Sequence, residues 1–383
     1  MKADLFSYPT PFTPPTTEED ELSFLRLIRS RRVGPTTFHR MIREHGTAQV
    51  ALAALPDVAH AAGVSDYQIC PEGVALAEIK AGRRAGARLI CHGSPAYPRA
   101  LAEIDDAPPI LWALGRLELL HSPMVAMVGA RNASSLGLRM ARRLAEGLGE
   151  AGATVVSGLA RGIDTAAHTA ALPTGTIAVQ AGGIEVTYPQ ENAKLAAEIA
   201  EHGLRLSENP PGTQPQARHF PQRNRIISGL SSGVVVVEAA TKSGSLITAR
   251  DALDQGREVM AVPGHPMDGR AGGCNLLIRD GAILVRGSED VLAALQAVTA
   301  PPQAAPDEIA PSPAPRETAQ KPASSAPPLE VRITACLTPS PVAEDQVIRD
   351  LGVSAAEFAR ALMVLEIEGH ITRHPGGLIS APV

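Results

Sequence analysis

Residues 233–249 read GVVVVEAATKSGSLITA, and this stretch decides the fold. Its four consecutive valines show no alternation of apolar and polar residues, which is typical of a strand buried on both faces of a parallel sheet. The small and polar residues 241–245 end the strand and cap the amphipathic pattern that follows. A buried strand followed directly by a helix is one βα unit of a layered α/β domain.

Six further apolar runs repeat this pattern along the chain. A helical pattern separates each run from the next, as βα units require. We therefore predict an α/β fold with a Rossmann-like, doubly wound and mostly parallel sheet in a domain that covers residues 87–298. In such a sheet a ligand binds beyond the carboxyl ends of the strands. The runs are MVAMV at 124–128, TVVS at 154–157, TIAVQ at 176–180, LRLS at 204–207, EVMAV at 258–262 and AILV at 282–285.

The segments that flank the sheet domain differ from it in composition. Residues 1–20 are rich in Pro and Thr and then acidic, so we expect a disordered tail. Residues 21–86 repeat apolar positions at helical spacing, which predicts a small helical, SAM-like domain. Residues 299–328 are rich in Pro and Ala, which indicates a linker.

The C-terminal segment, residues 329–383, has the element order of a winged-helix-like domain. A helix at 344–351 is followed by a turn, a second helix at 355–369 and a two-stranded wing. The segment carries four Arg and no Lys against seven Asp or Glu, a net charge of −3. Because domains that bind the major groove are basic, this charge favours a contact with protein, or dimerisation, over one with DNA.

The turn Val33-Gly34-Pro35 in the N-terminal helical segment resembles a helix-hairpin-helix motif. In that motif, backbone amides at a helix start hold a DNA phosphate. A solvated helix face around a Gly-Pro turn explains the same residues, and we favour that interpretation. The arginines that surround the turn are Arg29, Arg31, Arg32, Arg40 and Arg43.

The composition limits the classes of function. Aromatic residues make up 3% of the chain, which argues against a protein that stacks every base of a bound strand on a ring. The net charge of −5 requires any nucleic-acid site to be a local basic pocket. The four cysteines lack metal-ligand spacing, so no metal site is expected. No apolar run resembles a signal peptide or a membrane span, so we expect a cytoplasmic protein without membrane contact.

Four segments at predicted strand ends are suited to binding a phosphate. Their glycines and serines expose backbone amides, and their cations neutralise an anion. We expect the positive end of the helix that begins near Ser134 to add to this site. The predicted phosphate-binding residues are Gly129, Arg131, Ser157, Gly158, Arg161, Arg223, Asn224, Arg225, Lys242, Ser243, Gly244 and Ser245.

Three titratable residues near these segments have two interpretations. Asp164 and His168 are four residues apart on one helix face and could form an acid/base pair, but we favour a structural Asp–His hydrogen bond. Glu238 is a catalytic carboxylate in one interpretation and an ion-pair partner of the pocket cations in the other. The chain has no G-x-G-x-x-G or Walker sequence, no nucleophile elbow and no carboxylate cluster. We therefore expect no cofactor and no enzymatic activity.

Taken together, these motifs closely resemble the DNA-processing protein A family, also called Smf. The resemblance covers the whole sheet domain and extends to the flanking helical and winged-helix-like segments. It rests on GAR at 129–131, SGLARGID with the following AH at 157–168, GGIEVTYPQEN at 182–192, SENPPG at 207–212, FPQRNRIISGLS at 220–231, VVVVEAATKSGSLITA at 234–249, VPG at 262–264 and GGCNLLIRDGA at 272–282. The family's usual Gly-Ser-Arg is Gly-Ala-Arg here, which removes one hydroxyl near the phosphate.

This resemblance implies a bacterial protein that binds incoming single-stranded DNA, protects it and loads a RecA-type recombinase onto it during natural transformation. It also implies a homodimer joined through the sheet domain, and it maps the family's phosphate pocket onto the residues predicted above. The segment with Leu277, Ile278 and Ile283 resembles the family's dimer and recombinase-facing surface. On this account Arg131→Ala and Arg225→Ala each weaken binding of single strands.

Two alternatives remain open. In the first, the chain is a Rossmann-like nucleotide-monophosphate phosphoribohydrolase in which Glu238 is catalytic, while Arg131 and Ser243 hold a 5′-phosphate. The Pro-Gly-Gly-x-Gly-Thr loop of such enzymes is missing, which argues against it. In the second, the chain is a winged-helix regulator with a ligand-sensing sheet domain, which the acidic charge of residues 329–383 disfavours.

Overall fold

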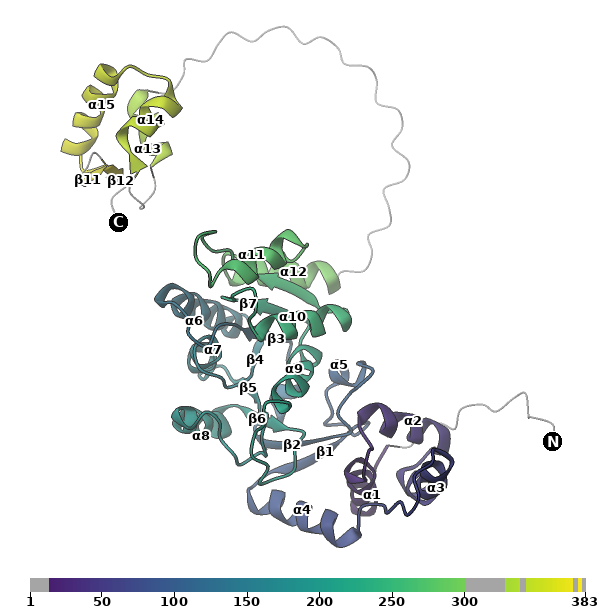
Figure 1. Ribbon diagram of the computed structural model, residues 1–383. Helices are drawn as coiled ribbons and strands as arrows, with labels where there is room; N and C mark the ends of the chain where they lie inside the picture. Colours follow the sequence, from purple (N-terminus) through teal and green to yellow (C-terminus); the bar gives the residue numbers. More distant parts are fainter. Residues whose placement is uncertain (1–13, 300–327, 338–341, 375–377, 381–383) are drawn as a thin grey trace, which may run out of the picture. The chain divides into compact units, whose positions relative to one another are not determined.

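The computed structural model describes residues 14–299, 328–337, 342–374 and 378–380 (Figure 1). The chain divides into one unit at residues 1–303 and a second at residues 304–383. Most of the predicted linker and the first part of the predicted tail therefore lie outside the described residues. Among those that are described, no helix is both long and apolar enough to cross a bilayer.

The first unit begins with a small helical domain. Its first helix starts at Glu18, inside the segment expected to be disordered, because Thr17 and Asp20 form a reciprocal capping box. The acidic run Glu18–Glu21 forms the first turn, where negative charge favours the positive helix end. The four helices are α1 (Glu18–Arg29), α2 (Pro35–His45), α3 (Ala48–Ala61) and α4 (Glu72–Arg84).

A nine-stranded sheet follows, in the order β1-β2-β6-β5-β4-β3-β7-β8-β9. All seven predicted runs form strands, and β3 to β9 pair in parallel. The pair β1 and β2 is antiparallel and was not predicted, and β2 joins the sheet antiparallel to β6. The strands are β1 (Arg88–Cys91), β2 (Ile110–Gly115), β3 (Met124–Val128), β4 (Thr154–Ser157), β5 (Thr176–Val179), β6 (Leu204–Ser207), β7 (Gly233–Val236), β8 (Glu258–Ala261) and β9 (Ile283–Leu284).

Helices cover both faces of this sheet, which explains why its strands are continuously apolar. On β7, Val234 and Val236 belong to one hydrophobic core, while Val235 and Val237, the residue directly after the strand, belong to the other. Figure 1 shows α6 and α7 on one side of the strands and α9 and α10 on the other. The helices are α5 (Arg99–Ala102), α6 (Ser135–Glu150), α7 (Ile163–Ala171), α8 (Ala193–His202), α9 (His219–Leu230), α10 (Ser245–Asp254), α11 (Gly272–Arg279) and α12 (Ser288–Thr299), with 3-10 turns η1 (Leu117–His121) and η2 (Gln190–Asn192).

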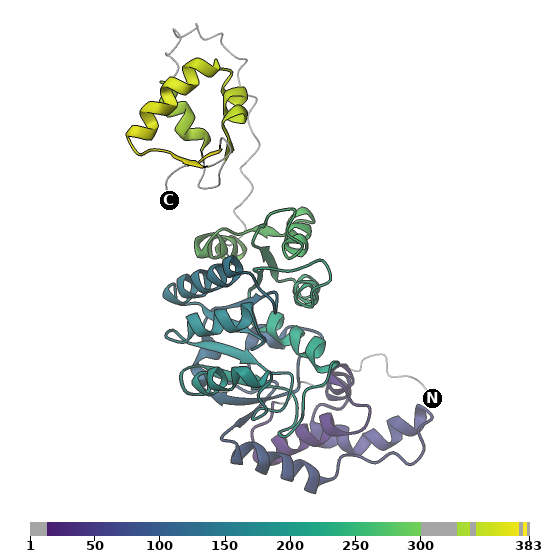
Figure 2. The same cartoon turned by 60° about the vertical axis from the view of Figure 1, so that its left-hand side comes forward.

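The strand order reverses at β3. The chain builds β3, β4, β5 and β6 outward in one direction and then places β7 on the opposite side of β3. Figure 2 shows the sheet domain, in teal and green, from a second side. The loops that leave β3 and β7 therefore diverge to opposite faces of the sheet. A crevice at such a switch point is where open α/β sheets bind ligands.

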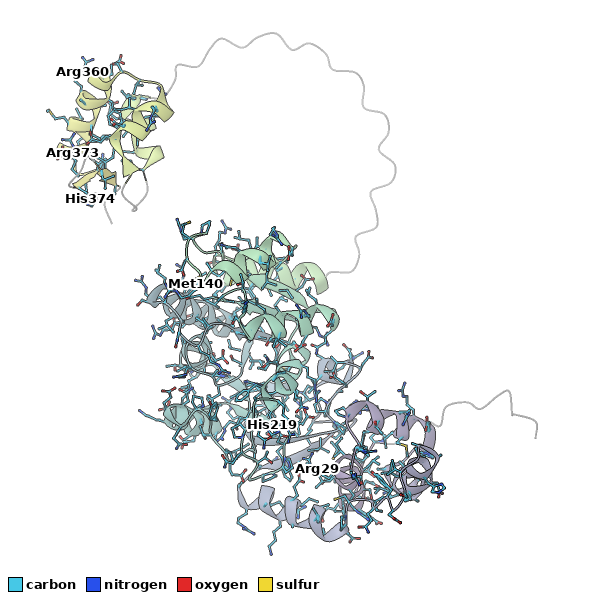
Figure 3. All side chains as sticks on the ribbon, in the orientation of Figure 1. Arg29, Met140, His219, Arg360, Arg373 and His374 are labelled. Carbon is cyan, nitrogen blue, oxygen red and sulfur yellow. The ribbon has the colours of Figure 1, made fainter. Side chains whose placement is uncertain are left out.

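A buried polar network fixes the helical domain to the sheet. Arg29 on α1 donates to both carboxylate oxygens of Glu78 on α4, at 3.0 and 2.9 Å, and to the carbonyl of Glu208 at 3.1 Å (Figure 3). Trp112 Nε1 on β2 donates to the same Glu78 carboxylate at 3.0 Å. One network of charge-assisted hydrogen bonds thus joins helices α1 and α4 to strand β2 and to the segment after β6.

The second unit has winged-helix topology. Helix α14 (Glu344–Leu351) has the predicted bounds, and α15 (Ala355–Ile367) ends two residues before its predicted end. Helix α13 (Leu329–Cys336) and strand β10 (Val342–Ala343) were not predicted. Strand β10 pairs with β12 (Leu378–Ser380), which also pairs with β11 (Thr372–His374) to form the wing.

The contact between Gly82 and Trp112 yields a stability prediction. A Cβ at Gly82 would lie 2.1 Å from Trp112 Cζ3, and the indole is fully buried. We expect Gly82→Ala to lower the free energy of unfolding by about 1–3 kcal/mol, measured by urea denaturation. Gly73→Ala on the same helix is the control, because its Cβ would meet no atom within 4 Å. Equal stabilities of the two variants would contradict this packing.

Candidate nucleic-acid interface

A cavity of about 760 Å³ opens at the switch point between β3 and β7. We call it the central cavity. The loop after β3, helix α9, and the loop after β7 with the start of α10 supply its walls. Four cations line it, and Asp164 is the single carboxylate among its lining residues. The cations are Arg131, Arg223, Lys242 and Arg270.

Close packing at Gly129 positions Arg131. The Ala130 amide donates to the Glu238 carbonyl at 2.6 Å, and the Ile163 amide donates to the Ala130 carbonyl at 3.2 Å. A Cβ at Gly129 would lie 2.6 Å from Ile163 Cγ1, so only glycine allows three chain segments to meet here. The exposed Arg131 guanidinium then lies 5.5 Å from the centre of the Phe220 ring, within cation–π range.

The loop after β7 supplies a second cation and a helix start. Lys242 is exposed and has no ion-pair partner among the described residues. Ser243 and Ser245 hydrogen-bond each other through their hydroxyls at 2.7 Å. Gly244 and Ser245, at the start of α10, line the central cavity, so the positive helix end faces it.

Helix α9 contributes one face to the central cavity. Phe220, Arg223, Asn224 and Ile227 line it, at a spacing of three, four and seven residues. Arg223 is buried, and its Nη1 donates to the carbonyl of Val179 at 2.9 Å. Its Nε finds no partner in the described structure. Burial lowers the pKa of Arg223 to about 10, so the group stays charged at neutral pH.

Arg225, predicted beside these residues, lies elsewhere. Its Nε is 3.3 Å from an Asp106 carboxylate oxygen, and its Nη2 pairs with Glu208. Successive helical residues are 100° apart, so Arg223 and Arg225 point about 200° apart around α9. Arg225 therefore lines a different, acidic hollow with Asp251 and Asp254, and it extends the network that holds the helical domain.

Ser157, Gly158 and Arg161, after β4, were predicted to bind a phosphate, but the nest of backbone amides in this segment already binds a carboxylate of the protein itself. The amides of Gly158 and Ala160 donate to Asp164 Oδ2 at 3.1 and 3.3 Å. Ser157 is fully buried and donates to the carbonyl of Met127 at 2.6 Å. Arg161 is exposed and pairs with Glu191 at 3.2 Å. The nest thus orders the loop, and Ser157 does not face the cavity.

Asp164 and His168 do not form the predicted hydrogen bond. Asp164 accepts from the loop amides, whereas His168 Nδ1 lies 2.8 Å from Thr176 Oγ1. Because the Thr176 hydroxyl donates to the Val155 carbonyl, the imidazole Nδ1–H must be the donor to Thr176. Burial, with Arg223 nearby, lowers the pKa of His168 to about 3. Both residues are structural, but with other partners than expected.

Glu238 also faces away from the central cavity. Its carboxylate accepts from the Ser134 amide and hydroxyl, at 3.1 and 2.9 Å, and pairs with Arg270 at 3.4 Å. The start of α6 is therefore capped by this carboxylate and does not add its positive end to the phosphate site as predicted. Of the two interpretations of Glu238, the geometry favours the ion pair. Across the described residues, no three His, Cys, Asp or Glu are grouped to hold a metal ion.

An aromatic pocket that was not predicted from the sequence lies next to the central cavity. Tyr188, which is 52% exposed, and Phe220 have ring centres 5.6 Å apart. Arg131 and Arg161 line the same hollow of about 250 Å³. We call this hollow the side pocket. Phe220 could have been found from its position three residues before Arg223 on one helix face, whereas nothing in the sequence near Tyr188 indicates its place.

The remaining predicted surfaces lie apart from the cavity. Ile283 is exposed on β9, the last strand of the sheet, and Leu277 and Ile278 lie half-buried on α11. In the helical domain, Arg29 is held by Glu78. The other four arginines near the turn at Gly34, which are Arg31, Arg32, Arg40 and Arg43, line neither the central cavity nor the side pocket.

Because His168 is buried and neutral, we predict that the folded protein becomes less stable as the pH falls. Its pKa is about 3 in the folded chain against about 6.5 in the unfolded one, so the unfolded chain binds more protons as pH falls. Stability should therefore decrease from pH 7 to pH 5, by about 2 kcal/mol from this group alone. Urea denaturation at both pH values should show a smaller decrease for His168→Gln. The same decrease in both proteins would contradict a buried neutral imidazole.

Comparison with known proteins agrees with this architecture. Residues 88–296 match the family model of DNA recombination-mediator protein A, residues 18–81 match the DprA-like N-terminal HHH domain, and residues 299–377 match the DprA winged helix domain. Protein Smf of Escherichia coli is 42% identical over 294 residues, covering 76% of each chain. DNA processing protein DprA of Streptococcus pneumoniae is 51% identical over 199 residues, covering 51% of this chain and 70% of that protein.

Solved structures give the same result. The X-ray structure of the S. pneumoniae protein matches with a TM-score of 0.58 and 38% identity, over 72% of this chain and 96% of that one. A structure that describes the single-stranded DNA binding mode of DNA processing protein A from Helicobacter pylori matches with a TM-score of 0.51 and 30% identity, over 55% and 97%. The chain belongs to the DNA recombination-mediator protein A family.

Proposed function

We propose that this chain binds single-stranded DNA in the central cavity, protects incoming DNA in the cytoplasm and loads a RecA-type recombinase onto it during natural transformation. This proposal rests on one observation. Arg131, after the end of β3, and Lys242, after the end of β7, line the same cavity. Both side chains are exposed, so they are free to contact a phosphate. The description of the H. pylori relative supports single-stranded DNA as the ligand.

Phosphates account for the affinity in this proposal. Arg131 offers a planar pair of donors to phosphate oxygens, and Lys242 offers a mobile point charge. Buried Arg223 keeps a fixed positive charge at the base of the cavity. Arg270 contributes less, because Asp268 and Glu238 already neutralise it. Contacts to the sugar–phosphate chain carry no base preference, so binding should be sequence-independent and sensitive to salt.

The side pocket favours a single strand over a duplex. The rings of Tyr188 and Phe220 line the side pocket beside Arg131, and we propose that an unpaired base stacks there. Bases in a duplex are already stacked on their neighbours and would have to be unpaired first. Two aromatic residues at one site are compatible with the low aromatic content of the chain.

We propose that the protein acts by binding alone. The phosphoribohydrolase alternative requires a carboxylate that faces a bound nucleotide. Glu238 caps α6 instead, and the single carboxylate that lines the central cavity, Asp164, is held by two amides. Release of free base from a nucleotide monophosphate would revive that alternative. The recombination-mediator description of the family supports a role in handing the strand to a recombinase.

We also propose a homodimer through the β9 edge. Strand β9 pairs with β8 on one side and ends the sheet. Ile283 and Leu284 on it are 37% and 44% exposed, beside Leu277 and Ile278 of α11. An apolar edge strand favours pairing with a second copy. A dimer would place two cavities on one strand and raise the avidity.

The phosphate contacts predict a selective loss of binding. We expect Arg131→Ala and Lys242→Ala each to weaken binding of oligothymidylate by about tenfold at low salt, measured by fluorescence anisotropy, with unchanged thermal unfolding. Arg116→Ala and Lys80→Ala are the controls. The Arg116 amide bonds the Gly203 carbonyl before β6, at the opposite end of the sheet, and Lys80 is exposed on α4. Unchanged affinity in both cavity variants would refute the proposal.

The dimer proposal predicts that Ile283→Asp makes the protein monomeric, because a carboxylate would be desolvated at the interface. Sedimentation velocity should show about half the mass of the wild-type species. Val74→Asp, on the 56% exposed Val74 of α4, is the control and should stay dimeric. A dimeric Ile283→Asp protein would exclude this edge as the interface.

A further inference from the structure

A groove of about 450 Å³ runs between α6 and α7, next to the central cavity. Its polar lining consists of Arg131, Asn132, Arg142, Thr165 and Thr169, and no carboxylate is among its lining residues. The chain as a whole has five more acidic than basic residues. A hollow with two arginines and no acid is therefore an anion-attracting surface on an acidic protein.

The groove continues directly from the central cavity. Arg131 and Asn132 line both hollows, so a ligand that leaves the cavity past Arg131 enters the groove. The wall on the α7 side is fixed. Gly162, at the start of α7, has a φ of +78°, and a Cβ there would lie 2.2 Å from the Ala130 carbonyl oxygen. The loop that carries Arg131 and the start of α7 are thus packed together, which keeps the entrance to the groove formed.

Arg142 is the cation inside the groove. It is exposed on α6 and, among the described residues, has no carboxylate within 4 Å. Other exposed arginines of this chain do have such partners, for example Arg116 with Glu118 at 2.9 Å and Arg286 with Asp290 at 3.0 Å. The charge of Arg142 is therefore not neutralised within the protein. Apart from Arg142, the polar groups that line the groove are the Arg131 guanidinium at its entrance, two hydroxyls and an amide.

The next residue supplies an internal comparison. Arg143 is also exposed and also lacks an ion pair among the described residues. It lines a different hollow on the other flank of α6, with Glu238 and His265. Met140 lines that same hollow and is labelled on α6 in Figure 3. Helix α6 thus carries one exposed guanidinium on each of two surfaces, and only the surface with Arg142 joins the central cavity.

We propose that the α6–α7 groove is a continuation of the DNA track, in which Arg142 binds a backbone phosphate of the strand that leaves the central cavity past Arg131. This inference rests on the proposed binding of single-stranded DNA in the central cavity. The groove holds phosphates of nucleotides that flank those in the cavity, without base contacts. Short strands fill the cavity alone, whereas longer strands also occupy the groove.

The experiment compares two lengths of oligothymidylate, about 5 and about 20 nucleotides, by fluorescence anisotropy across a salt series. For the longer strand we expect Arg142→Ala to weaken binding about three- to fivefold at low salt. We also expect its slope of log affinity against log salt to fall by about 0.7, the loss of one phosphate contact. For the shorter strand Arg142→Ala should bind like wild type. Arg143→Ala should bind both strands like wild type.

The outcomes separate the two proposals. If Arg131→Ala and Lys242→Ala both leave binding of both strands unchanged, the proposed function fails, and this inference fails with it. If Arg131→Ala weakens both strands but Arg142→Ala weakens neither, the cavity binds DNA and the groove does not. Equal losses for Arg142→Ala and Arg143→Ala would indicate a general charge effect and overturn the groove.

Discussion

The pairing of β3 with β7 is the constraint on which the site depends. Strands β4, β5 and β6 extend the sheet from one side of β3, so β7 can join only on the other side. Pairing continues past the strand ends, where Val237 bonds the Val128 carbonyl at 3.0 Å and Ala130 bonds the Glu238 carbonyl at 2.6 Å. These two hydrogen bonds fix the position of one loop relative to the other before the loops diverge. Arg131 and Lys242 thus reach one cavity from positions 111 residues apart in sequence.

The acidic and basic side chains near the central cavity have different roles. Carboxylates that lie near the cavity are occupied in holding the backbone or other cations, as Asp164 does for the loop after β4 and Glu238 for the start of α6. The exposed cations Arg131 and Lys242 are left without such partners among the described residues. An acidic protein can therefore present a locally positive cradle, because the field near a phosphate depends on the closest charges.

Much of the fold could be predicted from the sequence, because strands buried on both faces need continuous apolar runs and glycine is required where segments meet, as at Gly129. The antiparallel strands at 88–91 and 110–115 were missed because neither belongs to a βα unit. Arg225 was misplaced because a cluster in sequence is not a cluster on a helix, where residues two apart face opposite sides. The position of Tyr188 depends on tertiary packing of the loop after β5, which no local pattern encodes.

A structure of the chain bound to an oligothymidylate tests the central claim most directly. We predict a backbone phosphate between the Arg131 guanidinium and the Lys242 ammonium, at the carboxyl ends of β3 and β7, with a base against Tyr188 or Phe220. DNA bound to another surface, such as the winged-helix domain or the hairpin at Gly34, with the cavity empty, would contradict it.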